Sequence, residues 1–393
     1  MTPVELSRTV LHAVRRAVDD GELSVTVPAR AVITPPGPGG CGDYATNIAL
    51  QLARPAGYPP RRVAEILRPR LADADGIGDV AITGPGFLNI SLRSGAPAAL
   101  VEEILRRGVR YGYADGSGGD GDAPNAASGQ GQGAASGQDA VDGQDSAGGQ
   151  RGGAVPGAPV RLRCPREVRA LVVMDAVARI MRSQGLSVRT GCEARPEDAW
   201  IAVLGLRVDA YGGGAEAPSG RPARAFTVRP APAPADPLPL GRDAARWALL
   251  HPAAHDRPRI TGEHLVQREG NPLFRVRYAH ARTRALLRNA ADLGFGPRAG
   301  DVAGAAGSRE LLAALADHPR VLGAAARHRA PDRLARHLVA VADAVLPYLP
   351  AVLPRGEEKP SAAHRARLAL AEAAGTVLAG GLSLLGIDAP DHL

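Results

Sequence analysis

Apolar side chains in the first part of the chain follow two different periods. From residue 2 to residue 20 they recur every three or four positions, which predicts an amphipathic helix with the apolar residues Val4, Leu6, Val10, Leu11, Val14 and Val18. Further along, segments 80–82 and 87–92 are extended and apolar, and a Gly-Pro-Gly turn separates them. Helical patterns precede and follow this pair of strands. The order predicts a compact α+β domain over residues 1 to 113.

From residue 241 to residue 393 the apolar pattern is helical throughout. The segments that begin RDAARW, NPLFRV, SRELLA, PDRLAR and SAAHRA all place apolar residues at three- and four-residue steps. The glycine pair at 380 and 381 is expected to interrupt the last of these helices. The pattern predicts an all-α domain, a bundle of four to six helices.

Two regions separate these domains. Residues 114 to 158 consist almost entirely of Gly, Ala, Ser, Gln, Asp and Pro, and cannot bury enough apolar surface to offset about 1–2 kcal/mol of conformational entropy per residue. A disordered linker is predicted there. Residues 159 to 240 show a strand-helix-strand pattern, PVRLRC, VRALVVMDAVARIMRSQG and LSVRTG, with weaker fragments after it. In its helix, Asp175 and Arg179 are expected to form an ordinary surface ion pair.

The charge of the chain is uneven. The formal net charge is +7, and every basic residue except Lys359 is an arginine. Residues 241 to 393 carry 21 basic against 15 acidic residues, whereas the predicted linker carries one arginine against six aspartates. Positive charge concentrated in a folded domain is typical of a phosphate-binding surface. On charge alone, an ordinary basic domain explains the excess almost as well.

The remaining composition predicts a cytoplasmic protein without a membrane, metal or cofactor site. Cys41, Cys164 and Cys192 are scattered and have neither a disulfide nor a zinc-site spacing. The N-terminus lacks the apolar core of a signal peptide, and we expect no 18-residue apolar run.

Residues 271 to 290, NPLFRVRYAHARTRALLRNA, combine an apolar stripe with five arginines. Arg277, Arg284 and Arg288 are separated by seven and four positions, so they share one helix face. This row is either a solvated basic face or a surface that contacts the phosphates or bases of RNA.

Several motifs resemble the arginyl-tRNA synthetase family. They are CGDYATNIALQLA with GPGFLNISL, the Asn-Pro followed by Tyr-Ala-His-Ala-Arg, and the final LALAEAAGTVLAGGLSLLGIDAP. The resemblance implies that residues 1 to 113 are the N-terminal additional domain, which contacts the D-loop side of tRNA. It also implies that residues 241 to 393 are the DALR-type anticodon-binding domain. RLRCPREVRALVVMDAVARIM is similar to the first strand and helix of the family's nucleotide-binding fold, so residues 159 to 240 are predicted to be a degenerate, Rossmann-like remnant.

The resemblance also implies the residues that contact tRNA. The predicted anticodon-arm residues are Asn271, Arg275, Arg277, Tyr278, Arg282, Arg284 and Arg288. Tyr44 and Asn47 are either D-loop contacts or capping and packing residues. His280 is expected to be structural, and Phe87 to be a core anchor beside its turn. Because the family has an aromatic and an uncharged polar residue where this chain has Arg275 and Arg277, we expect electrostatic affinity rather than strict base recognition.

The family's catalytic motifs are absent. Where a His-x-Gly-His motif is expected the chain has Cys-Pro-Arg-Glu, at 164–167, and no histidine occurs between His12 and His251. The only lysine is Lys359, so no Lys-Met-Ser-Lys loop is present. These features predict a non-enzyme, a catalytically inactive paralogue that holds tRNA at its D-loop and anticodon arm. Two alternatives stay open: a regulatory module that binds a protein partner in an aminoacyl-tRNA-linked pathway, and an active arginine–tRNA ligase.

Overall fold

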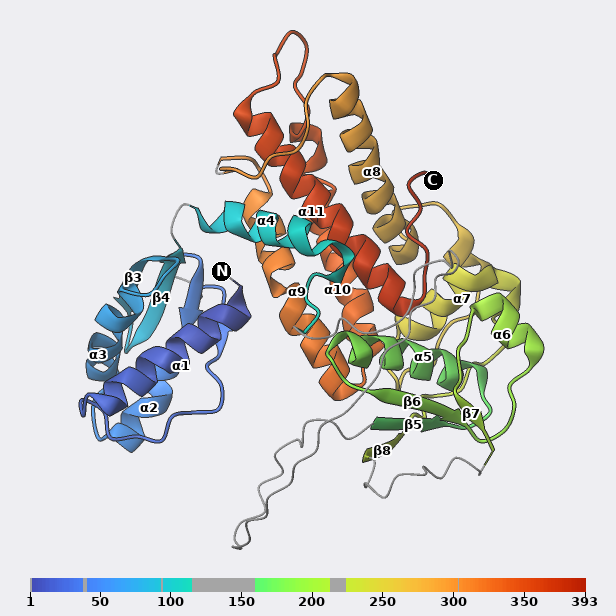
Figure 1. The fold of residues 1–393 in the computed structure, drawn as a ribbon, viewed down its shortest axis with the longest axis horizontal. Coiled ribbons are helices and arrows are strands. Elements are labelled where there is room, and N and C mark those ends of the chain that lie inside the picture. Colours follow the sequence, from blue (N-terminus) through green and yellow to red (C-terminus); the bar gives the residue numbers. More distant parts are fainter. Residues whose placement is uncertain (1, 38–40, 93–94, 115–159, 213–223, 303) are drawn as a thin grey trace, which may run out of the picture.

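The computed structural model describes residues 2–37, 41–92, 95–114, 160–212, 224–302 and 304–393 (Figure 1). The predicted linker, apart from Ala114, lies outside the described residues. Over the described ranges the predicted multidomain arrangement is confirmed at its two ends, an N-terminal α+β domain and an all-helical C-terminal domain.

The N-terminal domain packs helices on an antiparallel sheet and has a core of its own. Its helices are α1 (Pro3–Asp19), α2 (Ile48–Ala56) and α3 (Pro60–Ala72). Its strands, in spatial order, are β1 (Ile33–Thr34), β2 (Tyr44–Thr46), β4 (Phe87–Leu92) and β3 (Ile77–Thr83). Helix α1 begins at a capping box formed by Thr2 and Glu5, and Pro3 at its first position favours the helical φ. The predicted first helix and the predicted strand pair are both confirmed.

The middle region is a parallel sheet with the order β7-β6-β5-β8. Its elements are β5 (Val160–Cys164), α5 (Val168–Ser183), β6 (Val188–Cys192), α6 (Asp198–Leu204), β7 (Ala210–Tyr211) and β8 (Arg224–Thr227). Helix α5 is buried along nearly its whole length because the sheet covers one side of it and C-terminal helices cover the other.

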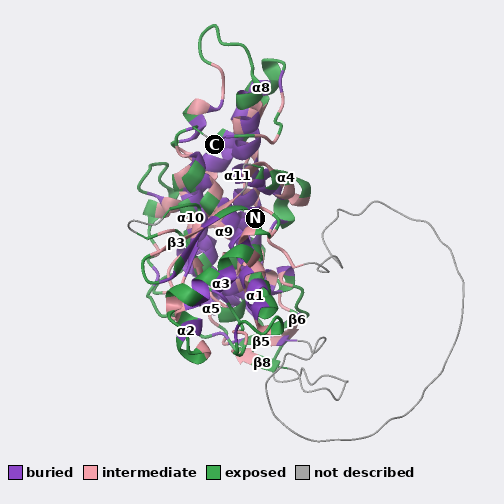
Figure 2. Cartoon of the chain, turned by 90° about the vertical axis from the view of Figure 1, so that its left-hand side faces the viewer, coloured by how far each residue is buried: buried purple, intermediate pink, exposed green. Residues whose placement is uncertain are grey.

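The C-terminal domain is built around one long helix, α11 (Ala362–Leu385) (Figures 1 and 2). The other helical segments are η2 (Leu238–Leu240), α7 (Gly241–Leu250), η3 (Gly262–Leu265), α8 (Pro272–Asp292), α9 (Ser308–His328), α10 (Pro331–Val345) and η4 (Leu349–Ala351). By length and composition α11 is apolar enough to cross a membrane, contrary to the expectation of no such run. However, 78% of its most apolar window is buried inside the protein, as in the core helix of a helical domain.

The expected interruption at Gly380 and Gly381 is wrong, because α11 continues through both residues to Leu385. A Cβ at Gly380 would collide with the backbone of Val109, and one at Gly381 would collide with the side chain of Leu338. These glycines therefore serve close packing against neighbouring segments and do not end the helix.

One helix from the N-terminal part of the sequence packs on the C-terminal domain. Helix α4 (Ala96–Arg107), followed by η1 (Gly108–Arg110), crosses α11 (Figure 1). Its buried residues Leu100, Val101 and Ile104 belong to the core of the middle and C-terminal regions, not to the core of the first domain.

A buried ion pair joins the middle region to the C-terminal helices. The side chain of Arg246 on α7 is completely buried and donates to Oδ2 of Asp175 on α5 at 2.6 Å. It also donates to the carbonyls of Leu385 and Leu204. The expected ion pair of Asp175 with Arg179 forms, but the expectation that it lies at the surface is wrong. Asp175 is only 3% exposed, and its carboxylate also pairs with Arg246.

A buried histidine pair lies where α9 meets α10. The rings of His318 and His337 are 5.2 Å apart, and Tyr111 stacks on His318. Among the described residues, His318 Nδ1, His337 Nε2 and the Tyr111 hydroxyl have no hydrogen-bond partner. Burial lowers the pKa of both histidines, that of His337 to about 4.

We expect this pair to make the protein less stable in acid. Below about pH 6.5 the unfolded chain binds protons at these histidines more readily than the folded chain does. The free energy of unfolding should therefore fall from about pH 6.5 towards pH 4, by up to about 1.4 kcal/mol per pH unit for each histidine. Urea denaturation at pH 7, 6 and 5 measures this slope. The variant His337→Leu should show a smaller slope, and an unchanged slope would contradict the assignment.

Candidate nucleic-acid interface

Helix α8 carries the predicted anticodon-arm residues except Asn271, which is its N-cap. This residue caps the helix: its side-chain oxygen accepts from the backbone N–H of Leu273, and its amide donates to the carbonyls of His264 and Val266. Pro272 follows at the first helical position, where a missing N–H costs nothing. The structure thus places Asn271 as a buried cap that fixes the start of α8.

The two arginines nearest this cap form ion pairs with other helices. Arg275 lies 3.4 Å from Asp343 of α10, and Arg277 lies 3.5 Å from Asp243 of α7. Both side chains are partly buried, and the Nε atom of each has no partner among the described residues. Arg277 also lines a cavity of about 320 Å³ between α7, η3, α8 and the C-terminus.

An aromatic surface lies next along α8. The rings of Phe274 and Tyr278 are stacked with centroids 5.4 Å apart, and the guanidinium of Arg282 lies over the Tyr278 ring at 5.9 Å. Tyr278 is 37% exposed. An exposed aromatic ring beside a guanidinium is the combination on which single-stranded bases stack.

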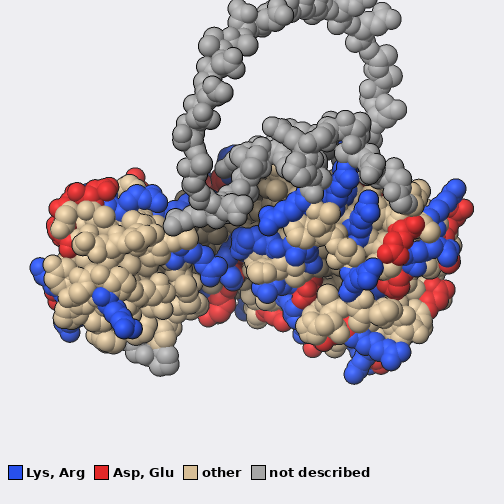
Figure 3. All heavy atoms as spheres, turned by 90° about the horizontal axis from the view of Figure 1, so that it is seen from below, with Lys and Arg blue, Asp and Glu red and all other residues tan. Residues whose placement is uncertain are grey.

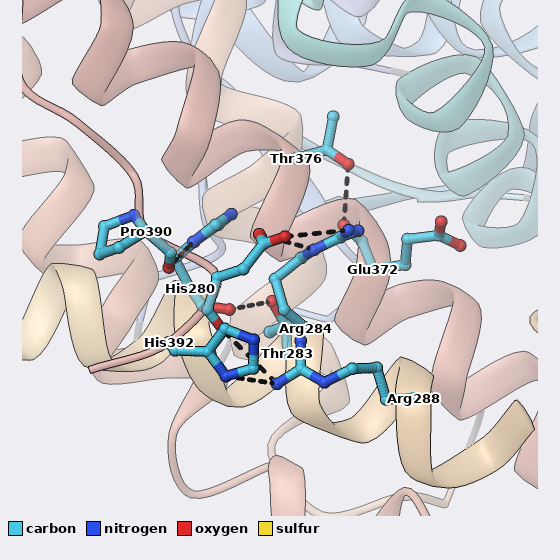
Figure 4. Close-up of polar contacts among 9 residues, drawn as sticks. His280, Thr283, Arg284, Arg288, Glu372, Thr376, Pro390 and His392 are labelled. Carbon is cyan, nitrogen blue, oxygen red and sulfur yellow. Dashed lines mark hydrogen bonds and ion pairs between the residues drawn. The ribbon is translucent and has the colours of Figure 1, made fainter. Parts of the chain in front are cut away.

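The last two predicted arginines contact the C-terminal tail, residues 388–393 (Figure 4). Nε of Arg284 donates to Oδ1 of Asp391 at 3.0 Å, and Arg288 donates to the Asp391 carbonyl at 3.4 Å. His280 is buried, as expected of a structural residue, and its Nδ1 lies 3.0 Å from the carbonyl oxygen of Pro390. The hydrogen bond from Arg284 lowers the pKa of Asp391, so this carboxylate is charged at neutral pH. Sequence reasoning missed the tail because its partners on α8 lie about a hundred positions earlier.

The predicted D-loop residues occupy neighbouring positions in the first domain. Tyr44 on β2 is half-buried, and this burial raises the pKa of its hydroxyl to about 12. Asn47 precedes α2 but makes no side-chain cap, and its side-chain oxygen accepts from Gln51 instead. The expectation that Phe87 anchors the core is wrong, because this residue is 40% exposed at the start of β4. The sequence signal for this exposure was the position of Phe87 directly after a tight turn, where side chains leave the sheet.

After the loop between β5 and α5, a side chain of the protein itself occupies the backbone N–H groups at the start of α5. The carboxylate of Glu167 accepts from the backbone N–H groups of Arg169 and Ala170 at the start of α5, and from that of Ala233. The side chain of Arg169 is buried and donates to five backbone carbonyls. Within the described residues, no group of three or more His, Cys, Asp or Glu side chains is arranged to hold a metal ion.

Comparison with known protein families identifies both ends of the chain. A model of the arginyl tRNA synthetase N terminal domain matches residues 5–92, and a model of the DALR anticodon binding domain matches residues 276–393. These ranges hold Tyr44, Asn47 and most of α8.

Similar proteins extend over the whole chain. An arginine–tRNA ligase of Frankia alni is 28% identical over 582 aligned positions that cover all of both proteins, although this chain has 393 residues. An arginine–tRNA ligase of Renibacterium salmoninarum is 50% identical over 115 residues, which are 28% of this chain and 21% of that protein.

Two solved structures share the fold. The Thermus thermophilus arginyl-tRNA synthetase matches with a TM-score of 0.62 at 15% identity, covering all of both chains. The Plasmodium falciparum arginyl-tRNA synthetase matches with a TM-score of 0.65 at 8% identity, covering 100% of this chain and 99% of the other.

These findings correct one prediction from the sequence. The absence of the two catalytic motifs predicted a non-enzyme, but relatives aligned over the full chain are named arginine–tRNA ligase, which is an enzyme. The absence of a motif is evidence about two short segments of the chain, whereas the alignment with these relatives extends over all of it. Together, the two matched domains, the full-length relatives and the shared fold show that the chain belongs to the arginyl-tRNA synthetase family.

Proposed function

We propose that this protein binds tRNA, with α8 on the anticodon arm and the N-terminal domain on the D-loop. The observation that carries the proposal is the exposed part of α8, where Tyr278 and Arg282 form a stacking surface and Arg284 and Arg288 add exposed guanidinium groups further along the helix. The DALR anticodon binding domain match over the same residues supports it.

The residues of α8 would have different roles. Tyr278 and Arg282 present flat groups to an unstacked base. Arg284 and Arg288 present guanidinium groups to phosphates, which contribute affinity without sequence information. Arg275 and Arg277 add positive charge from partly buried positions, and Asn271 holds the start of the helix.

The proposed D-loop contact uses Tyr44 and Asn47, with Phe87 as an added stacking residue. Asn47 is partly exposed, and only its side-chain oxygen is bonded, to Gln51, among the hydrogen bonds of the described residues. Phe87 offers an exposed ring on a neighbouring strand of the same sheet, since β2 pairs directly with β4. Base stacking on an aromatic side chain contributes about 1–3 kcal/mol.

Alanine at Phe87 or Asn47 should weaken tRNA binding without unfolding the domain. We expect about a fivefold to hundredfold loss of affinity for Phe87→Ala, from the stacking energy above, and a smaller loss for Asn47→Ala. The thermal midpoint should hardly change, because neither side chain fills the core. Tyr58→Ala, at another exposed aromatic residue of this domain, is the matched control. Equal losses for Tyr58→Ala and Phe87→Ala would count against a specific contact.

The sheet of the middle region is proposed to be a remnant of a nucleotide-binding, Rossmann-like fold. The order of its elements supports this proposal, since β5, α5 and β6 form a parallel strand-helix-strand unit.

Arginine–tRNA ligase activity is the second candidate, because full-length relatives carry that name. ATP–pyrophosphate exchange with arginine, and transfer of labelled arginine to tRNA, test it directly. In this chain an anion at the start of α5 would have to displace the carboxylate of Glu167. Product formation that depends on both ATP and the arginine tRNA would establish the activity, and its absence with active relatives as positive controls would reject it.

The proposed tRNA binding is tested by filter binding of an arginine tRNA transcript across a range of salt concentrations. We expect affinity to fall steeply as salt rises, because bound phosphates release counterions. No binding at low ionic strength would reject the proposal. Recovery of a defined protein from nuclease-treated extract, with no bound RNA, would favour a protein-binding module instead.

A further inference from the structure

The parallel sheet of the middle region has one face that no described element covers. Helix α5 packs on the face that carries Val160, Leu162 and Val188. The residues of β5, β6 and β8 that alternate with these point to the opposite face, and none of them is buried: Arg161, Arg163, Arg189, Gly191, Ala225 and Thr227. Parallel sheets usually have both faces covered. This face is therefore a candidate for contact with another molecule.

The open face is positively charged. Arg161 and Arg189 are direct neighbours in the parallel register, and Arg163 lies two residues further along β5. No carboxylate occurs among the outward residues of these three strands. Arg163 and Arg189 are exposed, and neither has an ion pair within the described ranges. Arg163 and Arg189 are diagonal neighbours on the open face, and because their like charges repel each other, a bound anion would stabilise this arrangement.

Further cations lie at the edge strand β8, where Phe226 pairs with Leu162 and so belongs to the side of the sheet that α5 covers. Phe226 is flanked by two guanidinium groups, with Arg329 at 4.1 Å and Arg224 at 5.6 Å from its ring centroid. Figure 3, a view from below Figure 1, shows blue side chains over much of this side of the molecule, with red ones among them. The surface offers several cations over an extended area, which suits a polyanion better than a single small anion.

We propose that the open face of the parallel sheet, through Arg163 and Arg189, binds the phosphate backbone of RNA. The identity of the polyanion as tRNA rests on the proposed function, whereas the place of binding rests on the uncovered face and its charge. The contacts would be to phosphates, so they add affinity and orient the RNA without reading its sequence. The tRNA would thus meet a third surface besides α8 and the N-terminal domain.

The experiment compares two charge-matched double variants of the full chain. Arg163→Gln with Arg189→Gln removes two charges from the open face, and Arg15→Gln with Arg309→Gln removes two exposed charges from α1 and α9. Binding of an arginine tRNA transcript is measured between about 50 and 300 mM salt. Each lost phosphate contact should reduce the slope of log K against log salt by about 0.7–0.9, so the first variant should lose about 1.4–1.8 and the second variant none.

The outcomes separate this inference from the proposed function. If the first variant binds with the slope of the control variant, while the wild type binds tRNA, the open face is not an RNA surface. If the wild type itself does not bind tRNA, the proposed function fails first. A third variant lacks residues 116–157. It tests whether the chain's own aspartate-rich stretch, and not RNA, binds the open face. If this variant binds tRNA more tightly than the wild type, and if Arg163→Gln with Arg189→Gln leaves tRNA binding by the full chain unchanged, the inference is also overturned.

Discussion

Replacing Arg246 with alanine is expected to lower the free energy of unfolding by about 3–5 kcal/mol, because it leaves a buried carboxylate without its main partner. The side chains of Arg246 and Asp175 are 0% and 4% exposed, so water cannot replace the lost guanidinium. The same change leaves the carbonyls of Leu204 and Leu385 without this donor. Urea denaturation followed by circular dichroism measures the loss, which should affect the cooperative unfolding of the middle and C-terminal regions.

Two further variants distinguish the stability lost with the buried ion pair from the stability lost when any arginine is removed. Arg179→Ala removes the partly exposed partner of Asp175 and should cost less than about 1 kcal/mol. Arg246→Met combined with Asp175→Leu removes both charges and should restore part of the stability lost in Arg246→Ala. If Arg246→Ala unfolds within about 1 kcal/mol of the wild type, the pair does not join the two regions as the structure indicates.

Local sequence patterns were sufficient for most of the helices and strands but not for their pairing; helix α6 and the continuity of α11 through its two glycines differ from what the patterns predicted. The apolar period placed α1 and the helices after residue 241, because an exposed helix must show its buried stripe in the sequence. The period of α4 gave no sign that its stripe packs on α11 rather than on the first domain. The buried pair of Arg246 with Asp175 joins positions 71 apart, and an isolated aspartate and arginine resemble surface residues in any sequence.

For the candidate site too, local patterns predicted the helix but not the contacts of its side chains. Asn271 and Pro272 lie at the start of α8, and the spacing of Arg277, Arg284 and Arg288 predicts that these three share one face. What each arginine contacts depends on residues far away in the sequence: Asp343, Asp243 and the tail. The exposure of Phe87 had only the adjacent turn as its signal in the sequence, because an aromatic residue in an apolar strand is usually buried.

The triple variant Arg282→Gln, Arg284→Gln and Arg288→Gln is expected to weaken tRNA binding about a hundredfold. Each charged contact contributes about 1 kcal/mol net, and three together correspond to roughly two powers of ten. The slope of log K against log salt should also fall by about 1.4–1.8, because Arg284 and Arg288 are the two proposed phosphate contacts and each contributes about 0.7–0.9. Filter binding of an arginine tRNA transcript measures both quantities, and the thermal midpoint should stay close to that of the wild type because these side chains lie at the surface.

The tail makes this prediction sharper, because Asp391 and RNA phosphates compete for Arg284. In the free protein the guanidinium of Arg284 is already paired with the Asp391 carboxylate, and Arg288 is held by the Asp391 carbonyl. Asp391→Asn removes that competing charge while keeping the shape of the tail, so it should strengthen tRNA binding. In the triple variant the same substitution should have no effect, because the arginine for which it competes is gone. An equal gain from Asp391→Asn in both backgrounds would mean that the tail acts only through net charge, and that RNA does not displace it from α8.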